Sequence, residues 1–237
     1  MKVLILAGGK GSRLSEDSAV KPKSLMEIGG KPILWHIMSI YANCGFNDFV
    51  ILLGYKGQMI QDYFLSYPEP NWKIDFLGTG LEAKKAQRIK KAEHLIDGDC
   101  FFVAYGDDLS DVDPKKIYEF HKKHNKIVTL TAMPLESNFG VIEINLENEV
   151  QSFKEKPRIE GYWINGGFFC FSNKIFDYLN DEEELEDKVF QKLATKGEIK
   201  AFKHNGFWKC MNTKKDIIEF NKLFSENNAP WMKHQDR

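Results

Sequence analysis

Glycines and cations gather in one short segment near the start of the chain. The segment from Leu4 to Lys31 reads LILAGGKGSRLSEDSAVKPKSLMEIGGK and begins as an apolar strand. Glycine lets backbone N–H groups approach a ligand closely, and such groups bind phosphate oxygens. The residues that carry this chemistry are Gly8, Gly9, Gly11, Arg13, Lys21 and Lys23. A strand, a glycine turn and three cations indicate a polyphosphate site.

Two carboxylates form a second chemical group in the middle of the chain. Asp107 and Asp108 follow an apolar run, Cys100 to Tyr105, that has the profile of a buried strand. Carboxylates at such a position suit Mg²⁺, which takes oxygen ligands from one or two carboxylates plus substrate phosphates. The simpler interpretation is a turn, which Asp often begins. We favour the metal site, because the glycine loop also follows a strand and both features then fall on one edge of a sheet.

The first half of the chain alternates strands and helices. Continuous apolar runs such as Asp48 to Leu53 are typical of strands buried on both faces. Repeated β-α-β units predict an α/β fold with a doubly wound, mostly parallel, Rossmann-like sheet, whose ligands lie beyond the carboxyl ends of its strands. Helices are predicted over Ile33–Cys44, Lys56–Leu65, Lys84–Ile96 and Pro114–His124, and further strands over Lys73–Leu77, Cys100–Tyr105 and Ile127–Ala132.

The second half predicts a small antiparallel elaboration on the substrate side. Strands close together in sequence are predicted over Phe139–Ile144, Val150–Phe153 and Tyr162–Phe171. Helices follow over Asn173–Leu179, Glu186–Ala194 and Thr213–Phe224, with an extended segment over Ile199–Phe202. No Pro/Gly/Ser-rich linker divides the halves. We therefore expect one domain over 1–237, with a nucleotide-binding half of about 1–132 and an acceptor-binding half of about 133–237 that ends in a helix.

Charge and cysteine usage limit the partners and the compartment. Lys and Arg number 33 and Asp and Glu 34, which gives a formal net charge of -1 and no general attraction for nucleic acid or an anionic membrane. No signal-peptide pattern or membrane-spanning run is found. The four cysteines show no C-x-x-C spacing. A reduced, cytoplasmic protein without a zinc site or a disulfide framework is expected.

Several motifs, in one order along nearly the whole chain, carry a family resemblance. They are LILAGGKGSRL with KPKSLMEIGGKPILWHI, GYKG at 54–57, YGDD at 105–108, EKP at 155–157, NGGFF at 165–169 and GFWKCMNT at 206–213. The chain resembles the sugar-phosphate nucleotidyltransferases, and within them the glucose-1-phosphate cytidylyltransferases. That resemblance implies transfer of a nucleotide from a triphosphate, here CTP, to a small phosphorylated acceptor, with release of pyrophosphate and with Mg²⁺ as cofactor.

The resemblance also implies roles for individual residues. Lys23, Arg13 and Asp107 would be catalytic: Lys23 on the α-phosphate, Arg13 on the pyrophosphate, and Asp107 on Mg²⁺ together with Asn212. The nucleotide would be bound by Leu6, Ala7, Gly8, Gly9, Gly11, Ser12, Arg13, Lys23, Thr79, Gln87, Arg88 and Gly106. The acceptor would be bound by Gly140, Glu155, Lys156, Asn165 and Gly166. Related enzymes form oligomers, so a homo-oligomer is expected, and Phe207 and Trp208 are assigned to the core.

Three departures from the family pattern leave the acceptor open. Ala86 and Gln87 replace a glycine pair before Arg88, Asn212 replaces a carboxylate, and the segment between Phe64 and Lys73 is short. The acceptor is glucose 1-phosphate or another phosphate, including a non-sugar such as phosphoglutamine, and the product would serve surface polysaccharide. A nucleotide-sugar glycosyltransferase and a non-catalytic nucleotide-binding regulator are the alternatives of other classes. A glycosyltransferase would not need the GGKGSR loop, because its donor is already activated and no triphosphate has to be bound.

Overall fold

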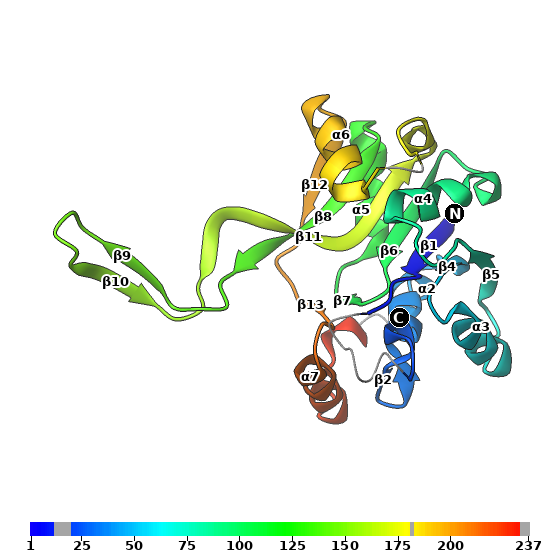
Figure 1. The fold of residues 1–237 in the computed structure, drawn as a ribbon, viewed down its shortest axis with the longest axis horizontal. Coiled ribbons are helices and arrows are strands. Elements are labelled where there is room, and N and C mark those ends of the chain that lie inside the picture. The colour runs from blue at the N-terminus through cyan, green and yellow to red at the C-terminus, as the bar shows by residue number, and fades with distance from the viewer. Residues whose placement is uncertain (12–19, 181–182, 233–237) are drawn as a thin grey trace.

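A seven-stranded sheet organises the molecule (Figure 1). The computed structural model describes residues 1–11, 20–180 and 183–232. Strand order is β12-β8-β11-β6-β1-β4-β5, and every neighbouring pair is parallel except those that include β11. The strands are β1 (Lys2–Ala7), β4 (Asp48–Leu53), β5 (Lys73–Gly78), β6 (Cys100–Tyr105), β8 (Val128–Glu136), β11 (Arg158–Ser172) and β12 (Ile199–Lys203). The predicted mostly parallel sheet is confirmed.

The central strands are apolar throughout because both faces of the sheet are covered. Successive side chains of a strand point to opposite faces. Val3 and Ile5 of β1 belong to one hydrophobic cluster, while Leu4 between them belongs to the other. All three are fully buried. This arrangement leaves no solvent-facing position on β1 and explains why its sequence shows no polar alternation.

Helices form a layer on each face of the sheet. The cluster that contains Val3 receives side chains from α2 (Ile33–Ala42), α3 (Gly57–Ser66), α5 (Pro114–His124) and α7 (Lys214–Ser225). The cluster that contains Leu4 receives side chains from α4 (Lys85–Lys91), the 3-10 turn Asn173–Asp177, the π-helical turn Leu185–Phe190 and α6 (Gln191–Thr195). None of the helices in the described ranges is long and apolar enough to cross a membrane.

Three predicted helices are shorter than expected or have another hydrogen-bond pattern. α4 ends at Lys91, and a 3-10 turn over Glu93–Leu95 takes the remainder of the predicted helix. The segment after β11 is a 3-10 turn rather than an α-helix, and the one near Glu186 begins as a π-helical turn. Hydrophobic spacing marks the buried face of a helix but does not distinguish these three hydrogen-bond patterns.

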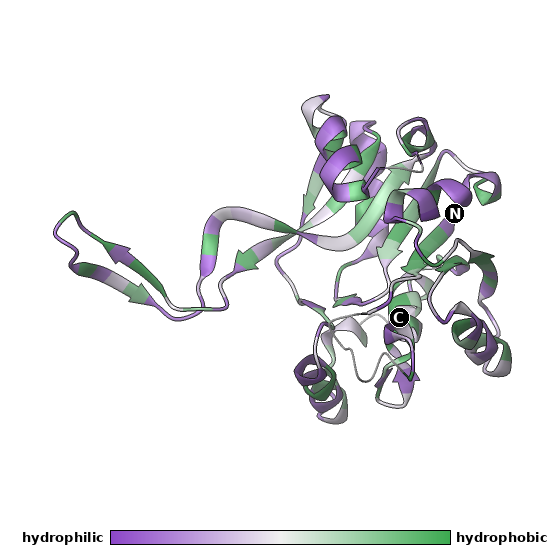
Figure 2. Ribbon diagram, viewed as in Figure 1, coloured by the Kyte–Doolittle hydropathy of each residue, from purple (hydrophilic) through white to green (hydrophobic). Residues whose placement is uncertain are grey.

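Two short strands stand away from the body of the molecule. β9 (Val141–Ile144) and β10 (Val150–Lys154) pair with each other in a two-stranded sheet of their own (Figure 1). We call residues 137–157 the arm. Apolar segments lie along it (Figure 2), and Phe139, Leu146 and Phe153 are each at least 66% exposed. An isolated two-stranded hairpin is marginally stable in water, so we expect another surface to pack on the arm and stabilise it.

Two further strand pairs lie near the carboxyl ends of the central strands. β7 (Asp108–Ser110) pairs with β13 (Trp208–Cys210), and β2 (Glu27–Ile28) pairs with β3 (Lys31–Pro32). Helix α7 begins with a capping box in which Thr213 and Asp216 satisfy each other's backbone N–H groups. These elements bring residues from the start, the middle and the end of the chain to one edge of the sheet.

Candidate active site

A cavity of about 760 Å³ opens at the carboxyl ends of β1 and β6. This is where a doubly wound sheet normally binds its ligand. The glycine loop and the Asp107 turn both line it, which confirms that they share one edge of the sheet. The remaining walls come from the 3-10 turn Lys23–Leu25 (η2), the segment 81–85, Asn165, Glu184, Trp208, Cys210 and Asn212.

The glycine loop approaches its neighbours more closely than a side chain would allow. A Cβ on Gly8 would lie 2.2 Å from a terminal nitrogen of Arg88, and one on Gly106 would lie 2.7 Å from the carbonyl oxygen of Leu6. Leu6, Ala7, Gly9 and Gly11 complete this wall of the cavity. Ser12 and Arg13, predicted to bind the nucleotide, lie outside the described residues.

Arg88 is buried and holds together the loops at the carboxyl ends of the strands. We call Arg88 and its hydrogen-bond acceptors the Arg88 brace. The residue surface of Arg88 is only 5% exposed, and its two terminal nitrogens donate hydrogen bonds to loops that follow three different strands. The acceptors are the carbonyls of Gly8 (3.1 Å), Leu53 (3.2 Å), Gly80 (2.9 Å) and Leu81 (3.2 Å), together with the Thr79 hydroxyl. Arg88 also lines the cavity.

Of the three residues predicted together for nucleotide contact, Arg88 lines the cavity, whereas Thr79 and Gln87 do not. Thr79 is fully buried and donates its hydroxyl to Leu53, 2.6 Å away, so it belongs to the same brace as Arg88. Gln87 is half-buried and is absent from the cavity wall. The other residues that line the cavity in this region are Leu81, Glu82, Ala83, Lys84 and Lys85.

Replacing Arg88 with Met is expected to lower the free energy of unfolding by about 3 kcal/mol, because three buried acceptors, on Gly8, Leu53 and Thr79, lose a charged donor. Urea unfolding followed by circular dichroism measures this change. Arg88→Lys keeps the charge but not the planar fork, so it should also destabilise the protein. Lys116→Met, at an exposed position of α5, is the control. A loss below about 1 kcal/mol for Arg88→Met would contradict the brace.

Lys23 lies between two oxygens at the base of the cavity. Its ammonium donates to Oδ2 of Asp107 at 2.6 Å and to Oδ1 of Asn212 at 3.3 Å. Only 13% of its side-chain surface is exposed. The backbone fixes all three partners: Pro22 precedes the 3-10 turn of Lys23, Met211 donates its N–H to the Asp107 carbonyl, and Asp216 accepts from the N–H of Asn212.

The position between Asp107 and Asn212 suits a cation. The Lys23 ammonium already lies within hydrogen-bond distance of both oxygens, which shows that two oxygens from separate segments of the chain converge on one positive charge. Both are hard oxygen donors of the kind that Mg²⁺ prefers. Asn212 supplies no negative charge, so this pair offers one charged ligand and one neutral ligand.

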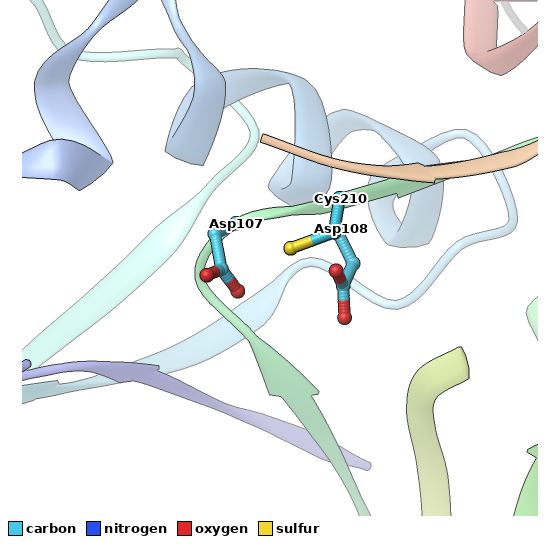
Figure 3. A group of neighbouring side chains, drawn as sticks. All are labelled: Asp107, Asp108 and Cys210. Carbon is cyan, nitrogen blue, oxygen red and sulfur yellow. The ribbon is translucent and has the colours of Figure 1, made fainter. Parts of the chain in front are cut away.

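Asp108 lies beside Asp107 and the thiol of Cys210 (Figure 3). The residue is 3% exposed, and burial, followed by the charge of Asp107, raises the pKa of its carboxyl well above its ordinary value. Burial also raises the pKa of the neighbouring Cys210 thiol, and Asp108 adds to that shift. Burial thus favours the neutral form of both groups.

A hydrogen-bonded chain fixes Asn165 in the cavity wall. Its side-chain amide donates to the Tyr105 hydroxyl at 3.2 Å, and that hydroxyl donates to Glu186. Lys85 also contacts Glu186, at 2.5 Å. Burial alone would raise the pKa of Glu186, but the hydrogen bonds from Lys85 and Tyr105 outweigh burial and lower it. A charged Glu186 therefore holds Tyr105 in a fixed orientation beneath Asn165.

The predicted acceptor residues fall into two groups in space. Asn165 lines the cavity, and the carbonyl of Gly166 accepts a hydrogen bond from the indole of Trp208 at 2.8 Å. Gly140, Glu155 and Lys156 instead lie on the arm, where the Glu155 and Lys156 side chains are 63% and 65% exposed. These three residues are not brought to the cavity of their own chain.

Several cavity residues were not anticipated from the sequence. Trp208 was assigned to the core, but it is only partly buried and also forms part of the cavity wall. Tyr105 and Cys210 lie within the YGDD and GFWKCMNT motifs but were given no role in the site, and Glu184 belongs to none of the motifs. Their one shared signal is position, because Tyr105 ends a buried strand and Cys210 pairs with Asp108 across β7 and β13.

Comparison with known proteins identifies relatives over nearly the whole chain. The model of the nucleotidyl transferase family matches residues 2–227. Glucose-1-phosphate cytidylyltransferase from Salmonella typhimurium is 41% identical over 98% of both chains, and a probable glucose-1-phosphate cytidylyltransferase from Bacillus subtilis is 39% identical over 98% of this chain and 99% of that one. The crystal structure of HddC from Yersinia pseudotuberculosis complexed with GMP-PN is 27% identical, covers 94% of this chain and 99% of that chain, and superposes with a TM-score of 0.74.

Proposed function

Because this chain belongs to the nucleotidyl transferase family, we propose that it transfers CMP from CTP to glucose 1-phosphate and releases pyrophosphate. The broader statement, that the chain is a sugar-phosphate nucleotidyltransferase, follows from its full-length relatives. The choice of CTP and glucose 1-phosphate is supported by the names of those relatives. It is also compatible with a cavity of about 760 Å³, which lies in the usual range for small-molecule sites.

One observation carries the proposal in geometric terms. A lysine ammonium, a carboxylate and an amide oxygen converge beside a loop of glycines at the end of a parallel strand. Phosphoryl chemistry needs little covalent help from the protein and depends on positioning and charge stabilisation. Lys23 and the backbone around Gly8 and Gly9 supply both.

The proposed reaction is an in-line displacement at the α-phosphorus. An oxygen of the acceptor phosphate forms a new bond to phosphorus as the bond to pyrophosphate breaks, so no protein nucleophile is required. Lys23 lies where it can neutralise charge that develops on the α-phosphate, and the glycine loop holds the other phosphates by its N–H groups. Arg13 is proposed to contact the departing pyrophosphate.

Asp107 and Asn212 are the proposed ligands of a Mg²⁺ ion that would neutralise phosphate charge when bound. For the ion to enter, the Lys23 ammonium must leave Asp107, from which it now lies 2.6 Å away. A lysine released in this way is free to move toward the triphosphate. Binding of the charged substrate and repositioning of Lys23 are thereby linked.

The acceptor is proposed to contact Asn165 and Gly166 in the cavity. Tyr105 and Glu186 hold Asn165 in place, and Trp208 holds the Gly166 carbonyl. Gly140, Glu155 and Lys156 remain proposed acceptor residues. Because they lie on the arm, they contact an acceptor only where the arm rests against a cavity.

We also propose that the protein is a homo-oligomer whose arm packs on a second copy. In the hairpin, Ile142 pairs with Phe153 and Ile144 pairs with Val150, so the four side chains share one face. Each of them is at least 50% exposed. Glu143 and Ser152 occupy the other face. An apolar face on a two-stranded hairpin is stabilised only when another surface covers it.

Replacing Ile142 and Val150 with Lys is expected to reduce the oligomer to smaller species, because two buried contacts would become charges. Size-exclusion chromatography with light scattering measures the mass in solution. Glu143→Lys, a charge change on the opposite face of the same strand, is the control and should leave the mass unchanged. A wild-type chain that is monomeric at all concentrations would overturn the proposed oligomer.

A panel of four nucleoside triphosphates against candidate phosphates tests the activity itself. Pyrophosphate release with CTP and glucose 1-phosphate is expected, and phosphoglutamine is the principal alternative acceptor. Release with UTP or dTTP but not CTP would overturn the cytidylyl assignment. A wild-type chain that is silent with every acceptor, combined with an active Asn212→Asp variant, would indicate a nucleotide-binding regulator.

The cellular setting is part of the same proposal. A cytoplasmic enzyme is supported by its cysteines, since all four are free thiols. The product, a CDP-linked sugar, would serve as a precursor for surface polysaccharide. No nucleic acid or membrane partner is proposed for a chain with a formal charge of -1.

A further inference from the structure

A second cavity, of about 580 Å³, opens at the edge of the sheet opposite the active site. It lies where β6, β8 and β12 begin and β11 ends, and its walls include Cys100, Ile127 and Ser172. The length of β6 separates this edge from the turn of Asp107, a distance of about 20 Å at roughly 3.3 Å per residue. An occupant of the second cavity therefore cannot contact the groups of the proposed transfer. The volume is typical of a small-molecule site.

The wall of the second cavity carries a surplus of positive charge. Four lysines line it, Lys122, Lys126, Lys174 and Lys196, against two carboxylates, Asp99 and Glu198. Lys126 pairs with Glu198 at 3.5 Å. Within the described ranges the other three lysines have no carboxylate partner, and they come from α5, the 3-10 turn Asn173–Asp177 and the end of α6. Three separate elements thus direct unpaired ammonium groups to one cavity.

His121 adds a buried ring whose proton position follows from its neighbours. The residue is only 5% exposed. The N–H of Lys126 donates to Nδ1 of His124 at 2.9 Å, so His124 carries its proton on Nε2 and donates it to the Thr129 hydroxyl at 2.7 Å. Among the described residues, the only acceptor for the proton of that hydroxyl is Nδ1 of His121, at 2.8 Å. His121 therefore carries its own proton on Nε2.

This Nε2–H group of His121 has no acceptor in the described part of the chain. It is also not one of the fully enclosed polar atoms, so it is exposed to the second cavity, which the ring lines. Burial, followed by the charges of His124 and Lys122, lowers the pKa of His121 to about 4, so the ring is a neutral donor at neutral pH. Buried polar groups normally have a partner. A donor among unpaired ammonium groups is best satisfied by an anion.

We propose that the second cavity binds a small phosphate-bearing anion: inorganic phosphate, pyrophosphate or a sugar phosphate. The three unpaired lysines would neutralise its charge, and Nε2 of His121 would donate to one of its oxygens. A phosphate group suits this wall because it carries up to two negative charges and several acceptor oxygens, which can meet donors from different elements at once. The site is separate from the active site and does not depend on the proposed cytidylyl transfer.

Nuclear magnetic resonance of the imidazole rings tests this site. Protein labelled with nitrogen-15 histidine, without CTP or metal, is titrated with inorganic phosphate at neutral pH and constant ionic strength. The His121→Asn variant assigns the His121 signals. We expect a proton on Nε2 of His121 before the titration, and a saturable shift of that signal as phosphate is added. Parallel titrations with pyrophosphate and glucose 1-phosphate show which phosphate source binds most tightly, and sodium chloride alone should cause no shift.

Replacing both Lys122 and Lys174 with Gln should weaken phosphate binding at least about tenfold, because two charge-assisted contacts are lost. The matched control replaces Lys115 and Lys116 with Gln. These two lysines are exposed on the first turn of α5, so the control removes the same charge and should leave the affinity unchanged. Circular dichroism verifies that both double variants are folded.

Lys23→Ala separates this cavity from the active site. Because Lys23 lies at the opposite edge of the sheet, this variant should keep the phosphate-dependent shift of the His121 signal. Absence of a saturable shift with all three anions, or an equal affinity after replacement of Lys122 and Lys174, overturns the second site. The titration involves no turnover, so its failure is distinguishable from a failure of the proposed cytidylyltransferase activity.

Discussion

Lys23→Ala is expected to lower kcat at least about a hundredfold, with little effect on the free energy of unfolding. The ammonium is largely enclosed, with 13% of its side chain exposed, and lies 2.6 Å from Asp107 at the base of the cavity. Charge stabilisation in such an enclosed site is stronger than in water, and loss of one donor typically costs a factor of 10² to 10³. Steady-state pyrophosphate release at saturating CTP and acceptor measures kcat.

Lys21→Ala is the control for this change. Lys21 belongs to the same K-P-K motif, but it pairs with Glu27 at 2.5 Å and lies outside the cavity wall. Its removal should change kcat less than about threefold, as for an exposed ion pair. Near wild-type kcat for Lys23→Ala would remove Lys23 from the proposed chemistry.

Asp107→Asn is expected to lower kcat by at least about a hundredfold, even at high Mg²⁺ concentration. The substitution keeps the shape of the side chain but removes the one charged ligand of the proposed magnesium pair, leaving two neutral amides. It also frees Lys23 from its ion partner. The activity is measured over a Mg²⁺ titration, so that a change in metal affinity is separated from a change in kcat.

Asp99→Asn is the matched comparison because Asp99 precedes the opposite end of β6. That variant should keep wild-type kcat and an unchanged Mg²⁺ dependence. The fold should survive in Asp107→Asn, because the backbone carbonyl of Asp107, not its side chain, accepts the bond from Met211. Full activity of Asp107→Asn at any Mg²⁺ concentration would show that Asp107 is not the essential metal ligand.

The strands were predictable because burial on both faces leaves a clear trace in sequence. Asp48 to Leu53 and Cys100 to Tyr105 were predicted with the bounds that the structure has, since any polar residue inside either run would face a hydrophobic layer. The shared edge of the glycine loop and Asp107 was also predictable. Parallel strands place their carboxyl ends together, and β1 and β6 are parallel neighbours.

The burial of the Arg88 side chain was not predictable from sequence. A lysine and arginine segment suggests a solvated helix face, and only the tertiary arrangement supplies the carbonyls of Gly8, Leu53 and Leu81 that make a buried guanidinium acceptable. Family pattern placed Arg88 with the ligand, whereas the structure places most of its hydrogen bonds beneath the loops.

Long-range placement also limited the acceptor prediction. The spacing predicted strands near Val141 and Val150, but period-two patterning does not show whether a hairpin joins the main sheet. Glu155 and Lys156 consequently lie on the arm, while Asn165, nine residues beyond Lys156, lies in the cavity wall. Sequence order close to a site does not ensure proximity in space.

The packing of Arg88 against two glycines restricts the order in which this protein can acquire mutations. A Cβ on Gly8 or on Gly54 would lie 2.2 Å or 2.5 Å from the same Arg88 nitrogen. A side chain on Gly8 would displace the Arg88 side chain, one on Gly54 would also clash with the Gly8 carbonyl at 2.5 Å, and loss of Arg88 would leave its buried acceptors without their donor. Any single substitution at Gly8, Gly54 or Arg88 is therefore expected to destabilise the loops around the cavity. Directed evolution toward another nucleoside triphosphate should therefore keep Gly8, Gly54 and Arg88 unchanged and vary Leu81 to Lys84, which also line the cavity.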